Sequence, residues 1–191
     1  MDASSKDKLK NQLTYADYKK WEIAEGGRFE FIHGEAYTIP SPGERHQAIL
    51  MELSAQIHCF SRGKPFKVYP APFDVRLFYK DDESDDTVVQ PDITVICDNK
   101  KLGSEGCRGV PDLVIEILAP SNTDPEMARK LKLYKEAQVQ EYWVVDPAKK
   151  KLTAHNFKNG IIKSISYGSN ETVSTSILPG LEINLGQVFS G

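Results

Sequence analysis

Hydrophobic residues recur every three or four positions over residues 46–60, which is the spacing of one face of an α-helix. Ile49, Leu53 and Ile57 form the centre of this stripe, and Gly63 follows where a helix would stop. The pattern therefore predicts a helix over residues 46–60 whose apolar stripe packs against a core.

A second helix is predicted after the segment SNTDPE and is expected to run to about Gln138. Pro125 suits its first turn, because the ring of proline has the backbone angle that a helix start requires. Three residues can serve as the N-cap: Asn122, Thr123 and Asp124. On the helical wheel Lys130 shares the inward face with hydrophobic residues, whereas Arg129 and Lys132 point away. The inward hydrophobic residues are Met127, Leu131, Tyr134 and Ala137.

Three runs have the composition of buried strands, namely residues 73–79, 88–96 and 111–118. The connections between these runs are polar and too short for a crossover helix, so we expect the runs to form an antiparallel meander. Further strands are predicted over residues 141–147 and in two hairpins, around His33-Gly34 and Asn159-Gly160. The chain is therefore expected to adopt an α/β fold, with a mixed sheet flanked by helices.

The turn centres predict which residues of the meander lie opposite each other. The first connection, KDDESDD, is expected to be a solvated turn centred near Glu83, which places Asp74 opposite Asp92. The second connection is centred near Ser104, which places Asp92 opposite Glu116. Three carboxylates are therefore expected to line up across three neighbouring strands. The opposite face is expected to hold Val75, Ile93 and Ile115.

Glu116 is the most informative of these acids because it interrupts an apolar strand. A buried carboxylate is costly unless it is paired or coordinates a metal. Opposed carboxylates on strands about 5 Å apart can share one hard divalent cation such as Mg²⁺ or Mn²⁺. The candidate metal ligands are Asp92, Glu116, Asp74 and Glu30. Lys130 is the amine expected to face them, where it can position a water or offset charge on a phosphate.

Each of these residues also has a purely structural interpretation. Asp74 can pair with Arg76 or Arg28, and Asp112 can hold a strand end. A lysine on an inward helix face commonly extends its amine to the edge of the core. His46 is either a core histidine or a member of the metal pocket. The accessory candidates for the site are His46, Asp112 and Gln90.

The composition limits the class of protein. With 191 residues, 40% hydrophobic residues and a net charge of −3, the chain suits one domain, which we expect over residues 13–191 after a disordered tail over residues 1–12. The acidic balance argues against non-specific coating of nucleic acid, which requires many Lys and Arg residues. Its three cysteines form neither a disulfide framework nor a structural zinc motif. No signal peptide or membrane span is evident, so we expect a soluble, cytoplasmic protein.

Several segments carry recognisable motifs: RFEFIHGEAY, SPGERHQ, APFDVRL, VVQPDITVI, GVPDLVIEILAPSN, KLKLY, EYWVVDP and LPGLEINL. Together they resemble the Uma-type restriction endonucleases of the PD-(D/E)XK nuclease superfamily, from about Tyr15 to Phe189. The resemblance implies a restriction-endonuclease-like core, a DNA substrate, Mg²⁺ or Mn²⁺ as cofactor, and a homodimer, because cutting both strands takes two active sites. It makes Asp92 the motif aspartate and Glu116 the acidic residue of (D/E)XK.

One position departs from the family pattern, because Leu118 stands two residues after Glu116, where the motif has lysine. Relatives with this pattern take the amine from the following helix, which makes Lys130 the third catalytic residue beside Asp92 and Glu116. We therefore predict a metal-dependent endonuclease that hydrolyses DNA phosphodiester bonds. One alternative is a catalytically silent nuclease-fold module that binds nucleic acid or protein. A glycosidase is disfavoured, because its two carboxylates flank an open cleft.

Overall fold

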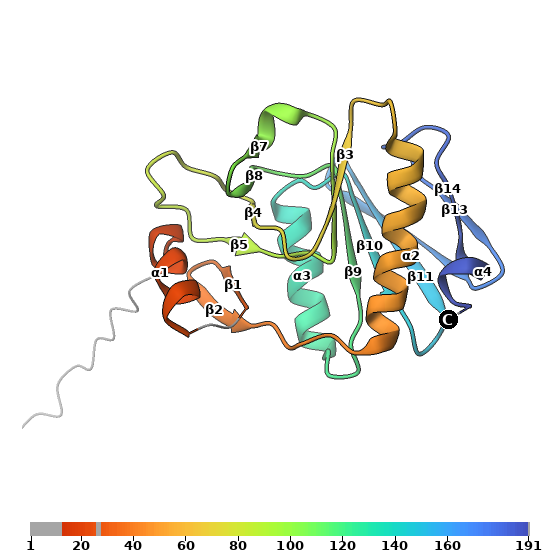
Figure 1. Ribbon diagram of the computed structural model, residues 1–191, viewed down its shortest axis with the longest axis horizontal. Coiled ribbons are helices and arrows are strands. Elements are labelled where there is room, and N and C mark those ends of the chain that lie inside the picture. The colour runs from red at the N-terminus through yellow and green to blue at the C-terminus, as the bar shows by residue number, and fades with distance from the viewer. Residues whose placement is uncertain (1–12, 26–27, 191) are drawn as a thin grey trace, which may run out of the picture.

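The computed structural model describes residues 13–25 and 28–190 of the chain. Figure 1 shows two sheets in different parts of the molecule, one beside α1 (Tyr15–Glu25) and the other behind α2 (Glu44–Ser61). The disordered tail predicted over residues 1–12 lies outside the described residues.

The two predicted long helices are confirmed. α2 buries the expected stripe of Ile49, Leu53 and Ile57. α3 (Asp124–Glu136) has Thr123 as its N-cap, and the Thr123 side chain accepts a hydrogen bond from the backbone N–H of Glu126 at 3.4 Å. The described residues also form a short α4 (Leu185–Val188) and a 3-10 turn over Asn99–Lys101.

The larger sheet, here called the core sheet, has the strand order β12-β11-β10-β9-β6-β3. β9 and β10 are parallel, and the other neighbours are antiparallel. On one face Ile93 and Ile115 pack in the main hydrophobic core with residues of α2. On the other face Val114 packs with Tyr134 of α3. The strands are β3 (Lys67–Pro70), β6 (Ile93–Ile96), β9 (Leu113–Ile117), β10 (Glu141–Asp146), β11 (Lys151–Lys158) and β12 (Ile161–Gly168).

The second sheet, here called the short-strand sheet, has the order β2-β1-β5-β4-β8-β7. It packs against α1 through a separate cluster that includes Tyr15, Tyr18, Phe31 and Val88. Only β4 and β8 are parallel among its described neighbours. The strands are β1 (Phe29–Ile32), β2 (Glu35–Thr38), β4 (Val75–Arg76), β5 (Val88–Val89), β7 (Leu102–Gly103) and β8 (Gly106–Arg108).

The mixed α/β class is confirmed, but the three predicted strand runs do not form one meander. The run over residues 88–96 divides at Gln90-Pro91-Asp92 into β5 and β6, which belong to different sheets. Proline has no N–H for a strand ladder, and the N–H of Gln90 donates instead to Glu30 Oε1 at 2.9 Å. The chain therefore crosses between the sheets at this point.

The register prediction is correct in the core sheet and wrong in the short-strand sheet. Ile93 pairs with Ile115, as predicted, so Asp92 and Glu116 are adjacent across β6 and β9. Val75, however, pairs with Val89 and packs with a different cluster from Ile93. The prediction that Asp74 stands opposite Asp92 is therefore wrong.

The error arises in the acidic connection, which is exposed at Asp81, Asp82 and Ser84 as a solvated turn should be, but is buried at Asp85. Arg76 pairs with Val88, so the turn is centred at position 82 and not at Glu83, and the shift moves each partner by two residues. Asp85 within this connection is buried and forms an ion pair with Arg76. A buried charge pair therefore holds the turn.

Both predicted hairpin turns are confirmed by their backbone angles. His33 and Gly34 have φ of 51° and 75°, and Asn159 and Gly160 have φ of 53° and 73°, the sign that a type I′ turn requires. A third pair of strands, β13 (Thr172–Ser174) and β14 (Glu182–Asn184), packs in the main hydrophobic core together with residues of α2. None of the described helices has the length and apolar character needed to cross a membrane.

Candidate active site

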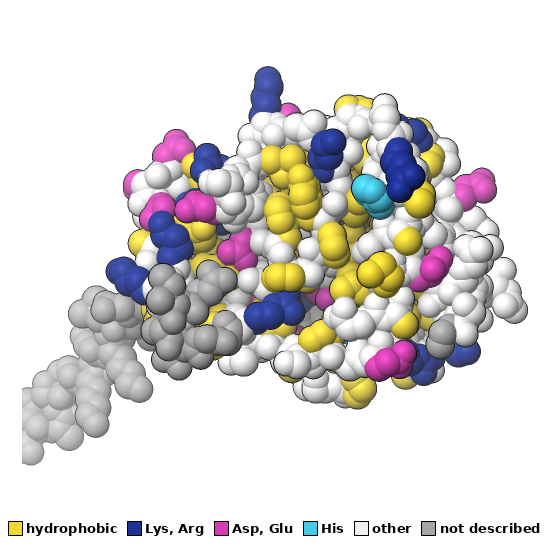
Figure 2. All heavy atoms as spheres, in the orientation of Figure 1, with side chains coloured by type: hydrophobic (Ala, Val, Ile, Leu, Met, Phe, Trp, Pro, Cys, Tyr) yellow, Lys and Arg dark blue, Asp and Glu magenta, His cyan; other side chains and the backbone are white. Residues whose placement is uncertain are grey.

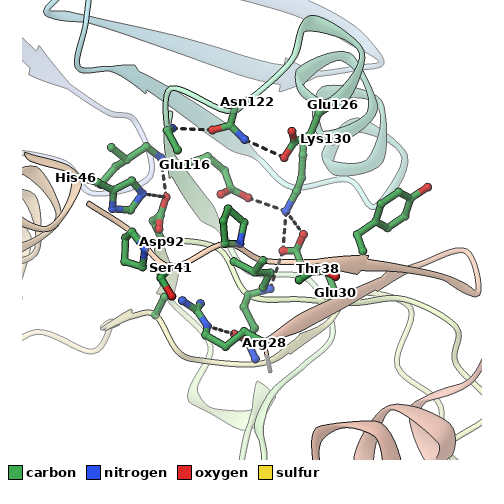
Figure 3. Close-up of a pocket in the computed structure, with 18 of the residues that line it drawn as sticks. Arg28, Glu30, Thr38, Ser41, His46, Asp92, Glu116, Asn122, Glu126 and Lys130 are labelled. Atoms are coloured by element: carbon green, nitrogen blue, oxygen red, sulfur yellow. Dashed lines mark hydrogen bonds and ion pairs between the residues drawn. The ribbon is translucent and has the colours of Figure 1, made fainter. Parts of the chain in front are cut away.

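Asp92 and Glu116 bring their carboxylates to one pocket from neighbouring strands of the core sheet (Figure 3). Each side chain is 16% exposed. Glu116 lies on the face of β9 that is turned toward α3, because side chains alternate along a strand and Ile115 and Ile117 face the main core. This alternation explains how an otherwise apolar strand presents one acid to the pocket.

Asp92 is held by two donors. Its Oδ2 accepts a hydrogen bond from the backbone N–H of Ile117 at 2.7 Å and lies 3.2 Å from Nε2 of His46, near the start of α2. Burial lowers the pKa of His46, but the hydrogen bond and charge of Asp92 outweigh that effect and raise the pKa above its usual value. His46 therefore belongs to the pocket and orients Asp92.

Lys130 joins acids from the two sheets. Its Nζ lies 3.1 Å from Glu116 Oε1 and 2.6 Å from each carboxylate oxygen of Glu30 on β1. Burial lowers the pKa of Lys130, yet the charges of Glu116 and Glu30 more than reverse this and raise it. Lys130 is therefore a protonated amine at the acidic site, reached from α3 as its place on the helical wheel suggested.

Tyr134 adds a contact that the sequence did not reveal. Its hydroxyl donates to Glu116 Oε1 at 2.6 Å from one turn further along α3 than Lys130. Burial, opposed by the charge of Lys130 and supported by those of Asp92 and Glu30, raises the pKa of Glu116 to about 7. Near neutral pH and without a cation, Glu116 thus exchanges a proton easily.

Gln90 connects this site to the short-strand sheet. Its side-chain amide donates to Asp74 Oδ1 at 2.8 Å and to the Tyr18 hydroxyl at 2.9 Å, while its carbonyl accepts from Arg28 Nε at 2.9 Å. Its backbone N–H binds Glu30, as described above. The accessory candidate Gln90 is therefore a buried hub beside the site, meaning a residue whose hydrogen bonds join several others.

Two predicted site residues lie elsewhere. Asp74 binds Tyr18 and Gln90 and lines a different hollow from the one that holds Asp92. Asp112 lies at the opposite end of β9 from Glu116, where its carboxylate accepts from the backbone N–H of Cys97 at 2.7 Å and from Gln140 Nε2 at 2.8 Å. Both acids therefore accept hydrogen bonds away from the pocket. Asp112 holds a strand end, as its structural alternative states, whereas Asp74 binds Tyr18 and Gln90 while Arg76 pairs with Asp85.

The pocket includes polar residues that the sequence patterns did not single out. Asn122 accepts from the backbone N–H of Ala119 at 2.6 Å and donates to Glu126 at 2.8 Å, which orders the turn between β9 and α3 (Figure 3). Arg129, which the wheel placed outward, is half-buried and lines the pocket. Of these polar pocket residues, Asn122 alone lies in a motif noted in the sequence, the APSN segment that follows β9.

The carboxylates of Asp92 and Glu116 suit a cation that needs only a few ligands from the protein. In the part of the chain that the structure describes, no group of three or more His, Cys, Asp or Glu side chains is arranged to hold a metal, so the expected four-acid ring is not formed. Asp92 Oδ1 and Glu116 Oε2 accept no hydrogen bond from another described residue. A carboxylate pair of this kind suits Mg²⁺, which keeps several waters and completes its shell with phosphate oxygens.

A family model described as "Uma2: Putative restriction endonuclease" matches residues 15–186. The chain belongs to the Uma2 family. An uncharacterised protein of Synechocystis sp. is 20% identical over 182 residues, which cover 94% of this chain and 93% of that protein.

The Uma2 fold is also seen in a solved structure. A crystal structure described as a putative nuclease belonging to DUF820, from Anabaena variabilis, superposes with a TM-score of 0.74 at 19% identity, covering 93% of this chain and 98% of that one. This likeness confirms the predicted α/β fold with mixed sheets and few helices.

In this Uma2 chain Leu118, which stands where the motif has lysine, lies just after β9, whereas Lys130 lies on α3. Leu118 follows the end of β9, and its backbone N–H donates to the carbonyl of Val145 on β10 at 2.8 Å. Lys130 instead reaches Glu116 from the helix that covers this face of the sheet. An amine is therefore present beside the acid pair despite the apolar residue at position 118.

Proposed function

We propose that this Uma2 protein is a Mg²⁺-dependent endodeoxyribonuclease with Asp92, Glu116 and Lys130 as its catalytic residues. The observation that carries the proposal is the 3.1 Å contact between Lys130 Nζ and Glu116 Oε1 at the pocket that also holds Asp92. The family description and the fold of the Anabaena protein support nuclease chemistry in general.

Asp92 and Glu116 are the residues that would hold Mg²⁺ or Mn²⁺. They would do so through Asp92 Oδ1 and Glu116 Oε2, the carboxylate oxygens that accept no hydrogen bond from another described residue. A bound divalent cation supplies charge that polarises the phosphate and lowers the pKa of an attacking water. Glu30 has a different task in this scheme: its carboxylate, fixed by the backbone N–H of Gln90, holds Lys130.

Lys130 acts as a positive charge and not as a base. Because Glu116 and Glu30 raise its pKa, the amine keeps its proton and cannot accept another. It orients the attacking water through its N–H groups and offsets the negative charge that develops on the phosphate. Water adds to phosphorus, the bond to the 3′ oxygen breaks, and the products carry a 5′-phosphate and a 3′-hydroxyl.

Double-stranded DNA is the proposed substrate, and two copies of the chain are proposed to cut it. Each chain contributes one acid pair, so cleavage of both strands in one encounter calls for a homodimer. The cytoplasm is the proposed compartment, and the free thiols of Cys59, Cys97 and Cys107 suit its reducing conditions.

Cleavage of supercoiled plasmid DNA with Mg²⁺ or Mn²⁺ tests the proposal. Lys130→Ala should lower the cleavage rate by roughly 100-fold or more, because one preorganised charge at the reacting phosphate is lost. Lys132→Ala is the matched control on the exposed side of α3 and should cleave like the parent protein.

A metal titration separates the roles of the residues. Mg²⁺ should raise the melting temperature of the parent and of Lys130→Ala, whereas Asp92→Ala should lose most of that gain. A parent protein that binds DNA but cleaves none with either cation would favour the catalytically silent module.

A further inference from the structure

Two arginines at the candidate active site have no role in the scheme above. Arg28 immediately precedes β1 and Arg129 lies on α3, directly before Lys130, and both line the pocket of Asp92 and Glu116. Within residues 13–25 and 28–190, neither guanidinium forms an ion pair with a carboxylate. Two permanent positive charges thus border an acidic pocket without being neutralised by it.

Each arginine is nevertheless held in place by a neutral contact. Arg28 donates from Nε to Gln90 Oε1 at 2.9 Å, which uses one edge of its guanidinium, and Figure 3 shows it across the pocket from Asn122. The Arg129 guanidinium lies 3.9 Å from the centroid of the Tyr37 ring, and its Nε is buried without an acceptor in the described residues. An aromatic face holds a cation without using its N–H groups.

These contacts leave donors available for a bound anion. A guanidinium presents N–H groups in a rigid fork that matches two oxygens of a phosphate. An unpaired buried Nε–H is costly, and an incoming acceptor would remove that cost. The arrangement is that of an anion site whose side chains are oriented before the anion arrives.

The charges of the pocket explain why a phosphate substrate needs this assistance. Four carboxylates line it, those of Glu30, Asp92, Glu116 and Glu126, against the single amine of Lys130. The whole chain carries a net charge of −3, and the face shown in Figure 2 has scattered Lys and Arg side chains and no broad basic patch. On this face, attraction for a polyanion must therefore come from individual basic side chains.

We infer that Arg28 and Arg129 form a phosphate-binding subsite that grips backbone phosphates of the DNA strand beside the one that is cut. The inference rests on the proposed nuclease function, because it names how the same site holds its substrate. Tyr37 is the positioning residue of this subsite, since its ring keeps the Arg129 guanidinium directed at the pocket.

Binding is measured apart from cleavage by placing all variants in a Glu116→Gln background and following a fluorescein-labelled DNA duplex by anisotropy over a range of salt concentrations. Arg28→Gln and Arg129→Gln should each weaken binding by roughly 10-fold at low salt. Each should also reduce the slope of log K against log salt by about one, the signature of one lost phosphate contact. Arg62→Gln, at the far end of α2 from His46, should bind within about twofold of the parent.

Substitutions at Arg129 and Tyr37 test whether binding depends on the orientation of the guanidinium or on its positive charge alone. Arg129→Lys keeps the charge but loses the fork, so it should bind almost as weakly as Arg129→Gln. Tyr37→Leu removes the ring under Arg129 and should weaken binding, whereas Tyr37→Phe retains the ring and should not. Melting temperatures of all variants establish that they are folded.

The outcomes distinguish this inference from the nuclease proposal. If the parent cleaves DNA while both arginine variants bind it with unchanged affinity and salt slope, the subsite is wrong and the nuclease stands. If the arginine variants lose binding but the parent with Glu116 intact never cleaves, the subsite stands and the nuclease falls. A parent that shows no affinity for the duplex overturns the subsite.

Discussion

The two sheets of this protein are held together by different forces. The core sheet buries apolar residues on both faces, such as Ile115 against α2 and Val114 against α3. The short-strand sheet has strands of only two to four residues, and besides its apolar clusters it buries several charged and polar side chains. Its buried polar residues include Glu30, Arg76, Asp85 and Gln90.

The candidate site lies where these two kinds of structure meet. Asp92 and Glu116 come from the core sheet, whose ladder sets the spacing of the two acids. Glu30 comes from the short-strand sheet, and Lys130 forms ion pairs with acids from both. Hydrophobic packing therefore provides the fixed geometry of the acid pair, while the short-strand sheet provides the carboxylate of Glu30, which holds Lys130 beside that pair.

The largest expected effect comes from breaking the buried ion pair of the short-strand sheet. Asp85→Ala leaves the Arg76 charge buried and should lower the free energy of unfolding by about 3–5 kcal/mol. Adding Arg76→Leu to that variant should recover much of the loss. Urea unfolding measures both. The exposed pair of Lys149 and Asp146 is the control, because Lys149→Ala should cost less than about 1 kcal/mol.

An apolar truncation in the core sheet should have a comparable but purely packing-based cost. Ile115→Ala removes a fully buried side chain and should lower the free energy of unfolding by about 2–5 kcal/mol. Ile162→Ala on β12, where the side chain is 37% exposed, should cost much less. If the two variants unfold at the same urea concentration, packing on the α2 face is not what holds the core sheet.

Removing the hub between the sheets should have a smaller effect. Gln90→Ala deletes the hydrogen bonds to Asp74, Tyr18 and Arg28 and should cost about 1–3 kcal/mol, the usual penalty for buried groups left without partners. The backbone N–H of Gln90 still holds Glu30, so plasmid cleavage should persist. Complete loss of cleavage in a folded Gln90→Ala protein would contradict this division of roles.

The smallest effect concerns the pH dependence of stability without metal. Because the pKa of Glu116 is raised to about 7, folded protein binds this proton more tightly than unfolded protein, and stability falls as pH rises from about 4.5 to about 7. Glu116→Gln removes that fall. In EDTA, its melting temperature relative to the parent should therefore increase from pH 5 to pH 8, with most of the change below about pH 7.

Glu182→Gln on the exposed surface of β14 controls for the loss of one carboxylate and should show no such trend. A difference between Glu116→Gln and the parent that is constant across this pH range would show that Glu116 does not titrate in it. Mg²⁺ should reverse the advantage of Glu116→Gln at pH 8, since a cation on Glu116 favours its charged form.

Local patterns were sufficient to predict much of the core sheet. The β6–β9 register followed from the period of two and one turn centre, and it brought Asp92 and Glu116 together as expected. The inward direction of Lys130 followed from the helical period and is confirmed by its contact with Glu116. These features depend on residues close in the chain or on one short connection, where backbone geometry leaves few alternatives.

The short-strand sheet could not be predicted in the same way. Its register depended on Asp85, whose burial reflects an ion pair with Arg76 and is invisible to a pattern in which acidic runs indicate solvent. One residue of error in that turn was enough to place Asp74 wrongly in the site. Short strands carry too few alternating positions to correct such an error.

The sequence by itself thus determined the two long helices, the two hairpin turns, the acid pair and the face of the helix that supplies its amine, because each follows from local backbone geometry. Only the tertiary structure decided that Glu30 forms an ion pair with Lys130. It also decided that Asp74 and Asp112 lie outside the site. The same holds for Arg28 and Arg129, which line the pocket. Those placements join residues as far apart as Glu30 and Lys130. They depend on how two sheets and a helix pack in space, and no local period encodes that arrangement.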